Sequence, residues 1–192
     1  MNIGVHNWRL AFRVCAVGGM LGILFLFTGC SSGNRFGNDS LGYLDVPSSY
    51  TIDTDSSLNK RSSDAQYVTM IARAKDHSNI RFISLAELSD DVKRQDLDME
   101  GFEDTCESLK DMGARSCDVR TIHIGNYEAV GLTVRATTAE ETAEEYNVEA
   151  NKEATGSTYI FTRGEKLIQI SVYQQETNDA ELQSFLNTYA EK

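Results

Sequence analysis

Short segments of alternating apolar and polar residues dominate the chain after residue 40. This alternation is the pattern of half-buried strands. The early strands predicted in this way cover residues 41–45, 50–53, 66–74 and 79–84. Pro47-Ser48-Ser49 separates the first two, and the polar residues 56–64 predict a loop before the third.

Two later pairs of alternating segments predict β-hairpins. Residues 119–124 and 128–135 flank Gly125-Asn126, and residues 157–162 and 166–173 flank Arg163-Gly164-Glu165. A glycine in a short polar connection between two such runs favours a tight hairpin turn.

Helical spacing of apolar residues predicts two strong helices. The first covers residues 99–112, ends at Gly113 and places on one side Met99, Phe102, Cys106, Leu109 and Met112. The second covers residues 179–190, is capped by Thr177 or Asn178 and places on one side Leu182, Phe185, Leu186 and Tyr189. Weaker patterns predict a short helix over residues 85–94 and an Ala- and Glu-rich helix over residues 138–153.

These elements together predict an α+β domain. Because hairpins dominate, the sheet is expected to be mainly antiparallel, with the helices packed on it. The sequence has no internal repeat, so residues 41–192 are expected to form a single domain.

Residues 1–29 have the organisation of an export signal. Arg9 and Arg13 make the segment positive, and an uncharged, mostly apolar run follows over residues 14–27. This run is short for a membrane-spanning helix, which needs ~20 residues to cross a hydrocarbon core of ~30 Å. Two interpretations of the segment are an ordinary signal peptide and a short buried helix, and in either of them the cysteine at position 30 would be incidental.

The apolar run ends in Phe27-Thr28-Gly29-Cys30, which resembles the lipobox of bacterial lipoproteins. Phe27 departs from this pattern, because the family usually has leucine there. The resemblance implies cleavage between Gly29 and Cys30 and attachment of a diacylglyceryl group, with acyl chains such as palmitate, to the Cys30 thiol. The protein would then be anchored to the cell membrane and face outside the cytoplasm. The small polar residues 31–40 predict a flexible tether between the lipid and the domain.

Charge narrows the range of partners. Loss of residues 1–29 removes two basic residues and no acid, so 16 basic and 29 acidic residues give the mature chain a net charge of −13. A chain this acidic is a poor candidate for binding nucleic acid or for lying flat on anionic lipid. The expected partners are the membrane, through the lipid, and another envelope protein.

Cys106 and Cys117 are the cysteines that remain in the mature chain besides Cys30. In a compartment that oxidises thiols they can form a disulfide, which would stabilise the fold by ~3 kcal/mol through loop closure. The alternative is two buried free thiols, since cysteine packs well as a small apolar residue.

One acidic segment matches a calcium-binding pattern. Five acidic residues have the spacing of the ligands in an EF-hand loop, with Gly101 at the sharp turn. They are Asp96, Asp98, Glu100, Asp104 and Glu107. The same segment overlaps the apolar stripe of the predicted helix over residues 99–112, and acids at a helix N-terminus are favoured by its dipole. We therefore expect no metal site, and these five residues are the weak candidate.

The order of the predicted strands and helices, together with one short motif, is similar to that of a known family. Gly42, Tyr43 and Pro47 form a Gly-Tyr-x-x-x-Pro opening, which is followed by early strands, a mid-chain helix, two hairpins and a terminal helix. In this order residues 41–190 resemble the PsbP/DcrB-like superfamily. The resemblance implies an α/β/α sandwich around a central antiparallel sheet and a role in binding or assembly. It implies no catalytic residue.

The expected function is that of a membrane-anchored lipoprotein that acts as a binding or assembly module at the cell envelope. The sequence has no G-x-S-x-G, H-E-x-x-H or phosphate-binding motif, so we expect neither an enzyme nor a cofactor. The alternatives are a small-ligand receptor, with or without calcium, and an envelope enzyme whose site is assembled from distant residues.

Overall fold

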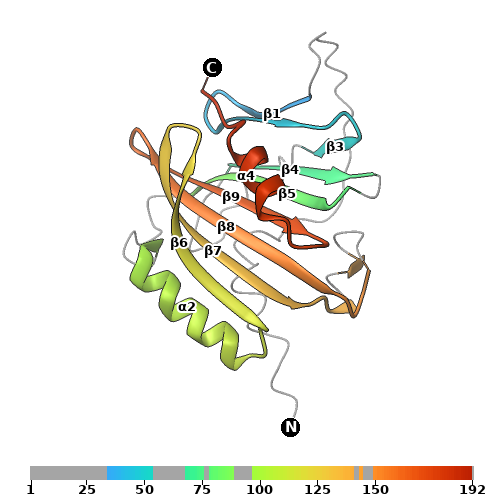
Figure 1. The fold of residues 1–192 in the computed structure, drawn as a ribbon. Helices are drawn as coiled ribbons and strands as arrows, with labels where there is room; N and C mark the ends of the chain where they lie inside the picture. Colours follow the sequence, from blue (N-terminus) through green and yellow to red (C-terminus); the bar gives the residue numbers. More distant parts are fainter. Residues whose placement is uncertain are drawn as a thin grey trace.

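A seven-stranded antiparallel sheet forms the centre of the molecule (Figure 1). The computed structural model describes residues 34–53, 68–75, 78–88, 97–140, 143–144 and 149–191. Along the sheet the strands are ordered β3 (Tyr50–Asp53), β4 (Val68–Ala74), β5 (Ile80–Leu88), β9 (Lys166–Gln174), β8 (Glu153–Arg163), β7 (Tyr127–Thr137) and β6 (Ser116–Ile124). The predicted α+β class with a mainly antiparallel sheet is confirmed.

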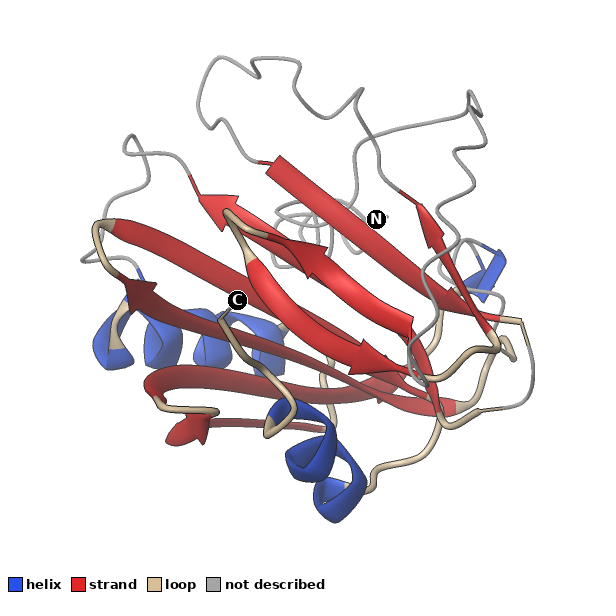
Figure 2. Ribbon diagram, turned by 90° about the horizontal axis from the view of Figure 1, so that it is seen from above, coloured by secondary structure: helices blue, strands red, loops and turns tan. Residues whose placement is uncertain are grey.

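Different elements cover the two faces of this sheet. Helix α2 (Met99–Asp111) packs on one face, over β6 and β7, and we call this the α2 face. Helix α4 (Asp179–Leu186) packs on the other, the α4 face, together with a hairpin of β1 (Asn34–Asn38) and β2 (Gly42–Val46). Figure 2 shows the strands from above with helices on either side.

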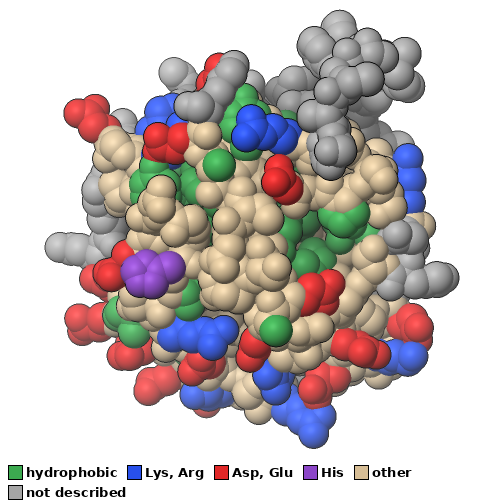
Figure 3. Space-filling model, turned by 45° about the horizontal axis from the view of Figure 1, so that its top comes forward, with side chains coloured by type: hydrophobic (Ala, Val, Ile, Leu, Met, Phe, Trp, Pro, Cys, Tyr) green, Lys and Arg blue, Asp and Glu red, His purple; other side chains and the backbone are tan. Residues whose placement is uncertain are grey.

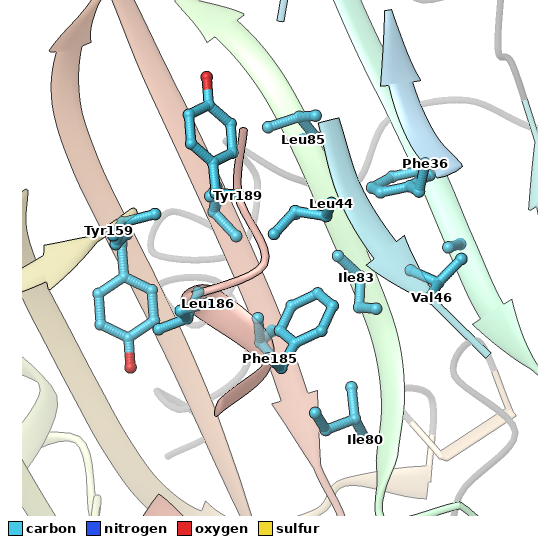
Figure 4. Packing of buried hydrophobic residues seen from close by; sticks show 14 of the residues in the cluster. Phe36, Leu44, Val46, Ile80, Ile83, Leu85, Tyr159, Phe185, Leu186 and Tyr189 are labelled. Carbon is cyan, nitrogen blue, oxygen red and sulfur yellow. The ribbon is translucent and has the colours of Figure 1, made fainter. Parts of the chain in front are cut away.

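The largest core lies on the α4 face. Side chains of β5, β8 and β9 meet the apolar sides of α4 and of the β1–β2 hairpin in this core. Figure 4 shows Ile83 and Leu85 of β5 beside Leu44 of the hairpin. Fully buried members of this core include Phe36, Leu44, Ile83, Leu85, Ile168, Ile170, Leu182 and Leu186. Burial of each large apolar side chain contributes about 1.5–3 kcal/mol.

The helix predicted over residues 99–112 is confirmed. Asp98 caps it, because its Oδ1 accepts a hydrogen bond from the Gly101 N–H at 3.0 Å. Its buried residues are Phe102, Cys106 and Leu109, three of the five positions in the predicted stripe. These side chains form a second, smaller core against the α2 face.

Both predicted hairpins are present and have the same kind of turn. Gly125 and Gly164 occupy the first central position of their two-residue turns, with φ of +55° and +61°. A type II′ turn needs this conformation at that position, and its twist matches that of the flanking strands. Glycine is therefore the residue that defines the register of each hairpin.

The predicted flexible tether is wrong for its second half. Residues 34–38 are strand β1, which pairs with β2 in register from Asn34–Val46 to Asn38–Gly42. Phe36 is fully buried, with 0% of its surface exposed. The prediction rested on small polar residues, and a single phenylalanine among them was enough to bring the segment into the core.

The short helix predicted over residues 85–94 is wrong as far as Leu88. These residues continue β5, a central strand bonded to β4 on one side and β9 on the other. Pairing on both edges stabilises the strand more than the weak helical spacing stabilises a helix. Residues 89–94 lie outside the described chain.

The helix predicted over residues 138–153 is also wrong at its ends. The Thr138 N–H donates to the Lys152 carbonyl, and the Asn151 N–H donates to the Thr138 carbonyl, both across the end of the β7–β8 ladder. Residue 153 already belongs to β8. Among the described residues of this segment only 140, 143 and 144 are helical.

Candidate functional site

Three turns and the C-terminal segment gather at one end of the molecule, at the upper left of Figure 1. They are the β1–β2 turn, the β6–β7 turn, the β8–β9 turn and residues 187–191. The C-terminal segment is fixed by a β-bridge, in which Tyr43 and Ala190 exchange two backbone hydrogen bonds of 2.9 Å each. Segments far apart in the sequence therefore form one surface.

A half-open groove of about 630 Å³ lies on this surface. It is lined by Gly125, Asn126, Tyr127, Asn187, Tyr189, Ala190 and Glu191. Figure 3 turns the top of the molecule forward, and there apolar side chains are visible between charged side chains of both signs. We call this site the end groove.

Aromatic rings stabilise the wall of the end groove. The rings of Tyr127 and Phe161 both meet the ring of Tyr189 edge-on. The centroid distances are 5.8 Å for Tyr127–Tyr189 and 5.1 Å for Phe161–Tyr189. The third pair, Tyr127–Phe161, is 5.1 Å apart. Such tilted pairs contribute about 0.5–1.5 kcal/mol each beyond their buried area. The three rings therefore stabilise one another in and behind the wall of the end groove.

Tyr189 joins the groove to the β1–β2 turn. Its hydroxyl donates to the Leu41 carbonyl at 2.7 Å, and it is 4% exposed. Gly42 has φ of +80°, and a Cβ there would be 2.3 Å from the Tyr189 hydroxyl, so only glycine fits. Burial raises the pKa of Tyr189 to about 12, although the positive charge of Arg163 acts to lower it. The hydroxyl therefore stays protonated as a structural donor.

A charged network holds the β1–β2 turn against the sheet. Glu87 on β5 accepts from Lys166 Nζ at 2.8 Å and from Ser40 Oγ at 2.7 Å. Arg163 Nη1 donates to the Ser40 carbonyl at 2.7 Å, and Arg163 Nε pairs with Glu191 at 3.3 Å. This network fixes the position of the C-terminal segment that lines the groove.

The pKa of Glu87 reflects this network. Burial alone would raise it, but hydrogen bonds from Lys166 and Ser40, with the charges of Lys166 and Arg163, outweigh burial and lower the pKa below 4.5. Glu87 is therefore ionised at neutral pH and holds Lys166 in place.

The chemistry of the end groove suits binding. Asn126 and Asn187 offer amide donors and acceptors, Glu191 offers a carboxylate, and Tyr127 offers a partly exposed ring. Across the described residues, no group of three or more His, Cys, Asp or Glu side chains is placed to hold a metal ion. His123, the histidine within the described chain, is exposed on β6.

The structure brings the two predicted cysteines together. Cys106 on α2 and Cys117 on β6 form a disulfide, with their Cα atoms 5.5 Å apart. This prediction is confirmed. The bond lies on the α2 face, away from the end groove.

The weak calcium candidate does not form a loop. From Asp98 onward the segment is the cap and body of α2, and Glu100, Asp104 and Glu107 are exposed on that helix. The helical stripe of apolar residues determined the conformation, as the competing interpretation expected. Asp96 lies outside the described residues, as do Gly29 and Cys30 of the lipobox.

The end groove was not predicted from the sequence. Tyr189 was assigned to the buried side of a helix over residues 179–190, but α4 ends at Leu186, and Tyr189 is buried in the segment that follows it. Gly125-Asn126 was correctly assigned to a turn. Neither assignment brings the two together. The only signal was indirect: Tyr127 directly follows the predicted turn at Gly125-Asn126, where a side chain can reach a surface.

Two solved structures are similar to this chain in fold, at low sequence identity. A protein from Bacteroides thetaiotaomicron has a TM-score of 0.51 at 10% identity, over 84% of this chain and 49% of that one, so this chain spans about half its length. Cyanobacterial PsbP (CyanoP) from Synechocystis sp. PCC 6803 has a TM-score of 0.48 at 15% identity, over 90% and 95%.

No protein family and no curated protein matches the sequence. None of the helices in the described ranges is both long and apolar enough to cross a membrane.

Proposed function

We propose that this protein is a lipid-anchored lipoprotein that binds another envelope protein through the end groove. The anchor is the acylated Cys30, and the mature domain faces outside the cytoplasm. The observation that carries the proposal is the position of the groove: it lies at the turn end of the β1–β2 hairpin, whereas the chain from Cys30 enters at the other end of that hairpin.

Chain length supports this orientation. Cys30 precedes Asn34, the first residue of β1, by four residues, so at most ~14 Å of extended chain separates them. Strand β1 then adds ~13 Å between its start and the turn. An anchor this short keeps the start of β1 close to the membrane and leaves the turn end, with the groove, directed away from the attachment point.

The composition of the groove supports binding of a protein surface. Aromatic rings together with two amides and one carboxylate line the groove, and recognition sites combine apolar surface with a few polar groups that fix orientation in this way. The net charge of −13 in the mature chain disfavours nucleic acid as the partner.

Two experiments in the cells that make the protein test the proposal. The first is metabolic labelling with radioactive palmitate, followed by separation of membranes. We expect label and membrane association in the unmodified chain and loss of both in Cys30→Ser. Label that persists in Cys30→Ser would exclude this anchor.

The second experiment places a photo-crosslinking amino acid at Asn126 in the groove. We expect one recurrent crosslinked envelope protein from Asn126 and none from a matched exposed position, Glu176, at the opposite end of β9. Equal crosslinking from both positions would mean that the groove is not the binding surface.

A further inference from the structure

Strand β6 is an edge of the seven-stranded sheet. It runs for nine residues, and Ser116, Asp118, Arg120, Thr121 and His123 have exposed side chains. An edge strand presents unpaired N–H and C=O groups that can pair with another chain. The question is whether those of β6 are available and what would pair with them.

The register of β6 shows which backbone groups point outward. Ile124 and Tyr127 close the two-residue turn, and the closing pair of such a hairpin is hydrogen-bonded. Bonded and non-bonded pairs alternate along the regular ladder from Ser116 to Ile124. The N–H and C=O of odd-numbered residues therefore point away from β7.

The His123 carbonyl agrees with this alternation, because it accepts a hydrogen bond from Gln183 Nε2 of α4 at 3.0 Å. Hydrogen bonds between described residues do not use the outward groups of Val119 or Thr121. Within the described part of the chain, the outward groups of these two residues are therefore available to pair with a strand.

Helix α2 lies beside this stretch and runs antiparallel to it. Met99 Sδ is 3.9 Å from Thr121 Oγ1, and Cys106 is bonded to Cys117. Glu103 is four residues after Met99 and three before Cys106, so it lies on the same flank of the helix. The disulfide holds this flank in position along the edge.

Met99 is the only large apolar side chain that is exposed in the described chain, at 36%. Exposed Glu103 lies next to it, one turn along the helix, and exposed Glu107 one turn further. A lysine or arginine side chain fits this surface. Its aliphatic stem can pack on Met99 while its charged group forms an ion pair with Glu103 or Glu107.

We propose that the β6 edge is a docking site for an extended, basic segment of a partner protein, which adds a strand beside Val119 and Thr121 and directs alternate basic side chains toward α2. Backbone hydrogen bonds to the edge supply affinity, and the contacts with Met99 and Glu103 supply preference for basic residues. Charge complementarity selects this occupant. A second copy of this chain is disfavoured, because pairing two β6 edges would bring two acidic α2 helices together.

The test uses the full chain, solubilised in detergent from whole cells so that recovery does not depend on the lipid anchor, and three labelled heptapeptides. The first alternates valine and lysine (VKVKVKV), the second has glutamate in place of lysine, and the third has the first peptide's composition with its lysines in one block. Fluorescence anisotropy measures their affinities. We expect the alternating lysine peptide to bind at least tenfold more tightly than either other peptide.

Two pairs of variants locate the site. Thr121→Pro removes the outward N–H without touching the bonds to β7, whereas Thr121→Ala keeps that N–H and removes only the exposed side chain. We expect at least tenfold weaker binding for Thr121→Pro and less than threefold change for Thr121→Ala. Glu103→Lys should weaken binding by a similar factor, and the control Glu176→Lys, far from the edge, should not.

Amide exchange in the unmodified chain gives a readout that does not depend on the folding of a variant. The peptide should slow exchange at Val119 and Thr121 and leave Arg120, whose N–H already faces β7, unchanged. Absence of binding, equal binding of the three peptides, or unchanged exchange at Val119 and Thr121 would each overturn the proposal, as would a concentration-dependent dimer by light scattering. Neither the lipid nor the end groove enters these measurements, so their failure is distinguishable from failure of the proposed function.

Discussion

Two buried tyrosines differ in whether the hydroxyl group has a hydrogen-bond partner, and this difference determines its effect on stability. Tyr159 on β8 is 1% exposed, and its hydroxyl has no hydrogen-bond partner among the described residues. Tyr189 is almost as buried, but its hydroxyl donates to the Leu41 carbonyl. In Figure 4 the two hydroxyl groups point in opposite directions. A buried polar group stabilises the fold only when it is paired.

Phenylalanine at each position tests this difference. Tyr189→Phe should lower the free energy of unfolding by about 1–2 kcal/mol, because it leaves the Leu41 carbonyl unpaired. Tyr159→Phe should leave it unchanged or raise it by up to about 1 kcal/mol, because it removes an unpaired buried hydroxyl. Urea titration gives both values, and each variant serves as the other's control. A loss of stability in Tyr159→Phe would show that its hydroxyl is bonded in solution.

At the scale of residues, the sequence predicted well which side chains are buried. It did not predict which hydrogen bonds and contacts they make. Leu182 and Leu186 were correctly placed on a buried side of α4, since helical spacing reports burial directly. Tyr189 is buried as expected, although it lies beyond the end of that helix. Its bond to Leu41 was beyond prediction, because 148 residues separate the two. The same holds for Gly42, whose neighbour in space is Tyr189.

At the scale of elements, β1 is the clearest case of a segment that its composition did not predict. Asn34, Arg35, Gly37 and Asn38 are polar or small, and only Phe36 carries apolar surface into the core. The alternation of a strand cannot be recognised from one apolar residue. The second half of central strand β5, residues 85–88, was misread as a helix for a related reason: nearly every position of the strand is buried, so it lacks the polar half of the alternation.

Removing the Phe36 side chain measures how firmly β1 belongs to the domain. Phe36→Ala should destabilise the fold by about 3–5 kcal/mol, as expected for a large buried ring. Arg35→Ala, at the exposed neighbouring position, should cost less than about 1 kcal/mol, since it loses only an exposed contact with the Tyr43 ring. Both values come from urea unfolding. Similar small losses in the two variants would mean that β1 is detached in solution.

The disulfide ties helix α2 to the edge strand β6. Replacing both Cys106 and Cys117 by alanine should lower the free energy of unfolding by about 3 kcal/mol, because the unfolded chain regains the freedom of the closed loop. Urea midpoints of the variant and of the oxidised parent measure the difference. Adding a reductant should move the parent toward the variant and leave the variant unchanged, and a parent that does not respond would indicate free thiols.

At the scale of the whole molecule, the Glu87 network links the hairpin, the sheet and the C-terminal segment, and it predicts a dependence on pH. The pKa of Glu87 is lower in the folded chain than its usual 4.5, so its stabilising effect is present above that pH and is lost as pH falls through the folded value. Glu87→Gln should therefore lower the urea midpoint at about pH 6, and the difference from the parent should narrow toward about pH 3. The exposed control Glu176→Gln should track the parent throughout. A constant difference across this range would exclude the titration of Glu87 as its cause.

The orientation of the anchored domain is a property of the whole molecule that chain length and fold determine together. If Cys30 carries the lipid, Ser48, which follows β2 next to the start of β1, lies near the membrane, whereas Asn126 in the end groove lies beyond the hairpin turn. A fluorophore attached at Ser48→Cys in lipid vesicles should be quenched more strongly by spin-labelled lipid headgroups than one at Asn126→Cys. Inserting a flexible segment of about 20 residues after Ser32 should remove this difference, because a tether of that length lets the domain turn freely. Equal quenching at both positions in the unmodified chain would mean that the groove faces the bilayer as often as it faces away, and the binding partner would then have to be sought among proteins embedded in the same membrane.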